Sequence, residues 1–126
     1  MPMTSSETMG WLRTAVGFAL IAAPRVPMRL TGWKEPAGAD VLLMRTIGIR
    51  DLVLGIGTIA AARSDNMTDA RRWTTAALAS DSLDTAASLA SYRSIGKRDS
   101  VGAAVLALAF VCGDLKARKD QAKSQP

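Results

Sequence analysis

Apolar residues gather in four stretches of the chain, separated by short segments rich in Gly, Pro and charged side chains. No stretch shows the alternation of apolar and polar residues that is typical of a half-buried strand. The pattern therefore predicts four helices bounded by capping and breaking residues. We place them at about 5–23, 41–62, 69–91 and 100–116, followed by a flexible polar tail over 117–126.

Capping residues stand at the expected starts of these helices. Thr4 and Glu7 have the spacing of a capping box at the first helix. Asp40 is a natural N-cap for the second, and Asn66 or Thr68 can cap the third. Because the connectors are short, consecutive helices are expected to be antiparallel neighbours. The predicted fold class is all-α, an up-and-down four-helix bundle, with a single domain over 1–126.

Two of the predicted helices have no polar face to present to water. The segments 15–23 and 101–113 are apolar all round, whereas a helix of a soluble bundle carries an outer polar face. This favours a transmembrane bundle, with a soluble helical oligomer as the alternative. The longest run without a charge, 100–113, has only 14 residues, and a membrane span needs about 20 mostly apolar residues.

Composition and charge exclude several classes of function. The chain has no His and one Cys, Cys112, so a Ser-His-Asp triad, a His-containing zinc site and an intramolecular disulfide are impossible. We predict no metal and no cofactor, and interpret Cys112 as a small hydrophobic residue. The net charge of +5 comes from dispersed Lys and Arg. Such a distribution fits a lipid bilayer as partner and gives no support for nucleic acid.

The distribution of basic residues also predicts an orientation in the membrane. With four spans, the side that holds both termini carries eight Lys and Arg, and the opposite side carries seven. By the positive-inside rule, this predicts a multi-pass protein of the plasma membrane with both termini in the cytoplasm.

Charged residues in the middle of the second and third helices are the candidate site. Arg50 and Asp51 lie about halfway along the second helix, and Asp81 and Asp84 are similarly placed in the third. Charges at membrane depth cost about 2.5–3.5 kcal/mol each on insertion scales, so they persist when paired. We expect Arg50 to pair with Asp81 or Asp84. If any residues are catalytic, the candidates are Asp81, Asp84, Arg50 and Asp51.

Small residues predict where these helices pack. Glycines in the second helix suit close contact between membrane helices, as does a small-or-polar stripe in the third. The first and fourth helices are expected to be plain apolar walls, so that any function lies between the second and third. The glycines are Gly48, Gly55 and Gly57, and the stripe is Ala76, Ser80, Asp84 and Ser88.

The second helix also carries a motif. Gly48, Arg50, Asp51 and Gly55 form Gly-x-Arg-Asp-Leu-x-x-Gly, which resembles the signature of small four-helix membrane proteins catalogued as domain of unknown function 4267. The resemblance would cover about 12–115. It implies an integral membrane location but supplies no activity, substrate or cofactor.

Three functional hypotheses follow. The first is a non-enzymatic structural or accessory membrane subunit, which forms a homo-oligomer or binds a membrane protein partner. The second is a membrane-embedded isomerase or lyase, or a proton-coupled transporter, that uses Asp81 and Asp84. The third is a soluble helical oligomer.

Overall fold

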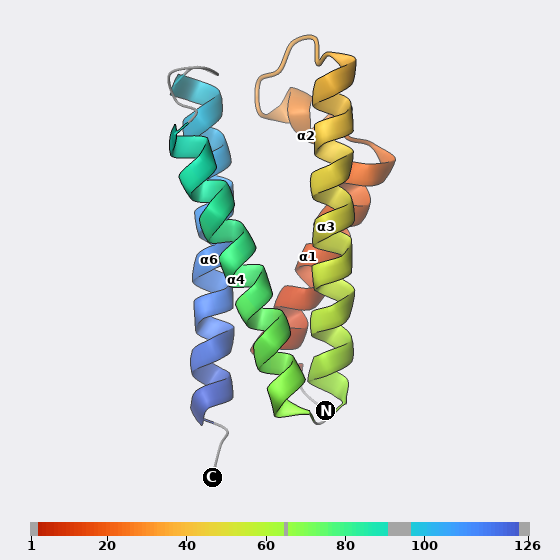
Figure 1. Ribbon diagram of the computed structural model, residues 1–126. Coiled ribbons are helices and arrows are strands. Elements are labelled where there is room, and N and C mark those ends of the chain that lie inside the picture. The colour runs from red at the N-terminus through yellow and green to blue at the C-terminus, as the bar shows by residue number, and fades with distance from the viewer. Residues whose placement is uncertain (1–2, 65, 91–96, 124–126) are drawn as a thin grey trace.

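The computed structural model describes residues 3–64, 66–90 and 97–123, and the regular secondary structure of these ranges is all helical. The predicted all-α class is therefore confirmed for the described chain. Its elements are α1 (Ser5–Ala22), α2 (Arg25–Leu30), α3 (Gly38–Arg63), α4 (Met67–Ala90) and α6 (Lys97–Lys123), shown in Figure 1.

The four long helices form two pairs. Helix α1 packs along α3, and α4 packs along α6, while α3–α4 and α1–α6 make fewer contacts. In Figure 1 the two pairs meet near the end that holds both termini, and they diverge toward the opposite end. The contacts that hold the two pairs together therefore lie away from the diverging end.

The short helix α2 was not predicted. It lies in the connector between α1 and α3, just after Pro24, and it buries Met28, which is 2% exposed. Pro24 is the N-cap of this helix and Pro27 lies in its first turn. Proline is tolerated at these positions because an amide hydrogen there would have no partner within the helix. Gly32 follows with a φ of 102°, a left-handed conformation that glycine adopts without strain.

Two of the predicted N-caps are confirmed and one is wrong. The Thr4 hydroxyl accepts a hydrogen bond from the Glu7 amide at 3.1 Å. The Asn66 side-chain oxygen accepts from the Thr68 amide, also at 3.1 Å. Asp40, by contrast, lies inside the first turn of α3, and its carboxylate accepts from the amide just before the helix at 2.9 Å. It caps the helix from the third position.

The predicted flexible tail is wrong as far as Lys123, because α6 continues to that residue. Residues 124–126 lie outside the described chain. Ala117 and Gln121 are buried in this part of α6, at 1% and 8% exposure. The Gln121 amide donates hydrogen bonds to the hydroxyls of Ser6 at 2.8 Å and Thr74 at 3.1 Å. These contacts tie the end of α6 to α1 and α4.

Glycines bring α1 and α3 into backbone contact. A Cβ atom added to Gly17 would lie 2.6 Å from the Gly48 carbonyl oxygen, and one added to Gly55 would lie 2.7 Å from the Gly10 carbonyl oxygen. Gly57 instead faces an aromatic ring on α4. The three glycines predicted as packing positions of the second helix therefore do lie at helix–helix contacts.

We expect Gly17→Ala to destabilise the protein by about 1–3 kcal/mol, because the new methyl group cannot fit without separating the two backbones. Gly38→Ala is the matched control, since nothing lies within 4 Å of a Cβ atom at that position. Thermal unfolding of the two variants in the same buffer measures the difference. Equal stability of both variants would show that α1 and α3 are not in close contact.

The packing face predicted for the third helix is wrong. In α4, Ala76 is exposed and Ser80 and Asp84 are partly exposed, and the side chain of Ser88 lies outside the described set. Small residues occupy every face of this helix, so their spacing alone does not show which face is buried. The buried face is formed by Ala70, Thr74, Ala77 and Asp81.

The length and hydropathy of the described helices bear on whether they can cross a membrane. None of them combines sufficient length with sufficiently high mean hydropathy and few enough charges to cross a membrane.

Candidate functional site, a buried arginine and carboxylate network

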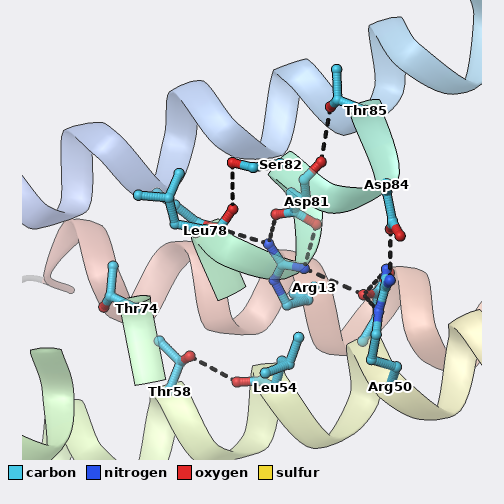
Figure 2. A network of polar contacts seen from close by, with 12 residues as sticks. Arg13, Arg50, Leu54, Thr58, Thr74, Leu78, Asp81, Ser82, Asp84 and Thr85 are labelled. Atoms are coloured by element: carbon cyan, nitrogen blue, oxygen red, sulfur yellow. Dashed lines mark hydrogen bonds and ion pairs between the residues drawn. The ribbon is translucent and has the colours of Figure 1, made fainter. Parts of the chain in front are cut away.

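The Arg13 side chain lies at the centre of the molecule and is 1% exposed. Its guanidinium contacts one carboxylate from each of the other three long helices. Nη1 lies 3.3 Å from Asp51 on α3, and Nη2 lies 3.0 Å from Asp114 on α6. Asp81 on α4 is bound in a bidentate manner, through Nη1 at 3.2 Å and through Nη2, as Figure 2 shows. A single side chain therefore links all four long helices.

An aromatic ring completes the surroundings of this guanidinium. The Phe110 ring on α6 lies with its centroid 4.7 Å from the Arg13 guanidinium carbon. Such a cation–π contact is strongest where water is excluded. The Arg13 guanidinium is thus bound by carboxylates through its N–H groups and by the Phe110 ring on one face.

A second arginine extends the network toward the surface. Arg50 on α3 lies 2.6 Å from Asp84 on α4 and 3.1 Å from Asp51. The side chains of Arg50 and Asp84 are 31% and 41% exposed. Asp51 therefore binds both arginines and joins a partly exposed pair to the buried centre.

The local sequence explains how Arg13 and Asp51 reach the centre. Each stands between two glycines with the same spacing, in Gly10-x-x-Arg13 followed by Gly17, and in Gly48-x-x-Asp51 followed by Gly55. All these residues are buried, on one face of α1 and one face of α3. The glycines bring the backbones together, so the charged side chains lie at the α1–α3 contact and extend toward α4 and α6.

The network contains two guanidinium groups and four carboxylates, and every carboxylate lies within 3.3 Å of a guanidinium nitrogen. Charges removed from water are costly unless they are paired and hydrogen-bonded. Breaking such a buried pair by removing one partner typically costs 3–5 kcal/mol. The network therefore holds the two helix pairs in one arrangement, because Arg13 of the first pair binds Asp81 and Asp114 of the second.

The four predicted site residues all belong to this network, and one of the expected pairs is present. Arg50 pairs with Asp84, as one of the two expected alternatives had it. Asp81 pairs with Arg13 instead, and Asp51 lies between the two arginines.

Two central residues were missed. Arg13 and Asp114 lie in the helices that we expected to be plain apolar walls, and that expectation is wrong. The glycine spacing around Arg13, which matches that around Asp51, is the signal that was available for the first. Asp114 follows Phe110 by one helical turn on the buried face of α6. It lies within the predicted helix over 100–116, but that face becomes visible only when the spacing is continued to Ala117 and Gln121.

The chemistry available to the network follows from this geometry. Within the described ranges, no group of Asp, Glu, Cys or His side chains is arranged to hold a metal ion. The positive charge in the centre is supplied by Arg13, toward which three carboxylates converge. The arrangement can fix helix positions, and the pair Arg50–Asp84 is its partly exposed end.

Comparison of the chain with protein-family models, with curated proteins and with solved structures gives no match. The resemblance of the Gly-x-Arg-Asp-Leu-x-x-Gly motif therefore stays a prediction.

Proposed function

We propose that this protein is an integral membrane subunit with a structural or accessory role, whose helices are held together in the bilayer by the Arg13 network. The observation that carries the proposal is an inverted distribution of polarity. Each of the four long helices buries a charged residue of the network: Arg13, Asp51, Asp81 and Asp114 are 1–4% exposed. Each also presents a large apolar side chain outward: Phe18, Leu42, Leu83 and Val105 are 61–70% exposed.

This distribution is costly in water and favourable in lipid. A soluble protein buries its large apolar side chains, at about 25 cal/mol per Å² removed from water, and it rarely exposes a large contiguous apolar surface. In lipid, polar and ionisable residues face the bundle interior and pair with one another. Mean hydropathy along a helix averages the inward charges with the outward apolar residues, whereas lipid contacts only the outward ones.

Other charges are absent from long stretches of three of the helices. Between residues 46 and 62 of α3, and between 73 and 90 of α4, the only charged residues belong to the network. The segment 101–113 of α6 has none. The remaining Lys and Arg lie outside these stretches. Arg63, Arg71 and Arg72 are near helix ends, where headgroups would lie, whereas Lys116, Arg118 and Lys119 follow Asp114 within two turns of α6.

An aromatic residue marks one of these ends. Trp11 is 46% exposed, and the Arg63 guanidinium lies 5.7 Å from its ring centroid. Arg63 also pairs with Glu7 at 2.7 Å. An indole ring beside an ion pair is typical of the membrane–water boundary. The plasma membrane, with both termini in the cytoplasm, remains our proposal for location and orientation.

The structural or accessory role is supported by the completeness of the network. Its carboxylates are each occupied by a guanidinium group, and the two pockets described for the chain are lined by other residues. A network of this kind fixes helix register and leaves the outward apolar faces for lipid, for a second copy or for a membrane protein partner.

Cell fractionation tests the proposal. We expect the protein to sediment with membranes, to stay there after alkaline carbonate washing, and to be released by a mild detergent. The physical reason is that the outward apolar side chains would be exposed to water if the protein left the lipid, and only detergent can cover them instead. Recovery of most of the protein in the high-speed supernatant without detergent would contradict the proposal and favour the soluble helical oligomer.

A proton-coupled transport step is the second candidate function, favoured by one observation. The ion pairs run without a break from partly exposed Asp84 through Arg50, Asp51 and Arg13 to buried Asp81. Acidic residues at membrane depth are typical of ion and proton pathways in transporters, and this chain of contacts begins and ends on an acid, whereas its two arginines stay protonated and position those acids. An isomerase or lyase that uses Asp81 and Asp84 would need a substrate to reach the same chain.

A further inference from the structure

The outward face of α4 forms a shallow hollow near the start of the helix. It has a volume of about 540 Å³ and lies on the side of α4 opposite the buried Ala70, Thr74 and Ala77. We call it the α4 groove. Its lining residues are Thr68, Arg71, Arg72, Thr75, Ala76 and Ala79.

The polarity of the α4 groove changes along its length. Arg71 and Arg72, together with two threonine hydroxyls, lie toward the beginning of α4, and Ala76 and Ala79 lie toward its middle. Both arginines are exposed. The first turns of a helix also carry a partial positive charge that favours anions. The groove thus offers a cationic, hydrogen-bonding end and a smooth apolar end.

One carboxylate competes for the cationic end. Asp69 lies 3.4 Å from Arg72, and their side chains are 46% and 76% exposed. An exposed pair of this kind contributes little, so a phosphate group can take the place of the carboxylate. No ion pair of Arg71 is found within the described chain.

We propose that the α4 groove binds an anionic phospholipid, with its phosphate at Arg71 and Arg72 and one acyl chain along Ala76 and Ala79. The inference rests on the proposed membrane location. The order of polarity in the groove matches the order of groups in a phospholipid, and the position of the arginines at the end of the bundle matches the depth of headgroups.

A second copy of the chain fits the groove less well. Copies inserted in one bilayer share their orientation, so a symmetric contact through this face would bring α4 helices together in parallel. Arg71 and Arg72 of one copy would then face those of the other, and like charges in contact are destabilising. The phosphate of an anionic lipid, by contrast, would neutralise Arg71 and Arg72.

The test uses the detergent-purified, delipidated protein and native mass spectrometry to count bound lipids. We expect phosphatidylglycerol to bind about tenfold more tightly than phosphatidylcholine with the same chains, because two arginines face the headgroup. The variant Arg71→Gln/Arg72→Gln should lose this preference. The matched variant Arg25→Gln/Arg29→Gln, which removes the same charge from exposed positions of α2, should keep it. Ala76→Phe retains both arginines but fills the apolar end, and it should weaken binding of both lipids.

Several outcomes would overturn the proposal. Equal binding of the two lipids would do so, as would an equal loss of preference in both double variants. Displacement of phosphatidylglycerol by inorganic phosphate at similar concentration would show a site for free anions. A dimer that Ala76→Phe dissociates, with lipid binding unchanged, would show a contact between copies. Failure of the membrane proposal is seen separately, as protein that remains soluble without detergent.

Discussion

Replacement of Arg13 by Gln is expected to abolish most of the folded protein. The substitution leaves Asp51, Asp81 and Asp114 buried around a neutral side chain, and it removes the contacts that join the two helix pairs. Loss of one partner from a buried ion pair costs about 3–5 kcal/mol, and small proteins are stable by only about 5–15 kcal/mol. The amount of monodisperse protein recovered in mild detergent after graded heating measures the effect.

Two further variants make this result specific to the network. Arg29→Gln removes the same charge from an exposed position on α2 and should leave recovery unchanged. Arg13→Gln combined with Asp81→Asn and Asp114→Asn removes the uncompensated negative charge and should restore part of the lost stability. If Arg13→Gln behaves like Arg29→Gln, Arg13 does not hold the bundle together.

Asp81→Asn is expected to have the next largest effect, about 3 kcal/mol. Asp81 is 2% exposed and binds Arg13 through both oxygens. Asparagine keeps one acceptor but places an amide donor against a guanidinium donor, which leaves two buried polar groups without partners. The midpoint of thermal unfolding, measured in the same detergent for all variants, reports the change.

Asp84→Asn is the matched control, because Asp84 is also on α4 and also binds an arginine. Its side chain is 41% exposed, and water screens such a pair, so the expected loss is below about 1 kcal/mol. If Asp84→Asn destabilises the protein as much as Asp81→Asn, the difference in burial between the two carboxylates does not determine their contribution to stability. A stable Asp84→Asn protein that has lost a transport activity would support the proton-coupled alternative.

The helices could be located from the sequence because their signals are local. Cap residues such as Thr4 and Asn66, together with long apolar stretches, gave boundaries close to those observed for α1, α3 and α4. Helix α2 was missed because proline is ambiguous as a signal: Pro24 and Pro27 are consistent with the end of the helix predicted over 5–23, and proline equally fits the beginning of a new helix. The end of α6 was missed because polar residues hid the continued spacing of its buried face.

The partners within the network could not be predicted, and the reason is physical. In a soluble bundle the apolar stripe of a helix shows which face is buried. Here the buried faces consist mainly of Gly, Ala, Thr and charged residues, with Val41, Ile59 and Phe110 among them, while many large apolar side chains point outward. Small residues occur around the whole of α4, so its rotation is set by the long-range contact between Asp81 and Arg13. That contact joins residues 68 positions apart, and no local pattern records it.

Labelling of the single cysteine tests the inverted bundle most directly. Cys112 is exposed in the structure and lies on the outer part of α6, two residues before Asp114. In intact membranes, we expect a water-soluble maleimide to leave Cys112 unlabelled, because lipid covers it, and to label it fully after denaturation in detergent. Ser64→Cys in a Cys112→Ala background, at an exposed position after α3, should react without detergent once the reagent reaches both sides of the membrane. Reaction of native Cys112 at the same rate as this control would show that water covers the outward face and would contradict the account.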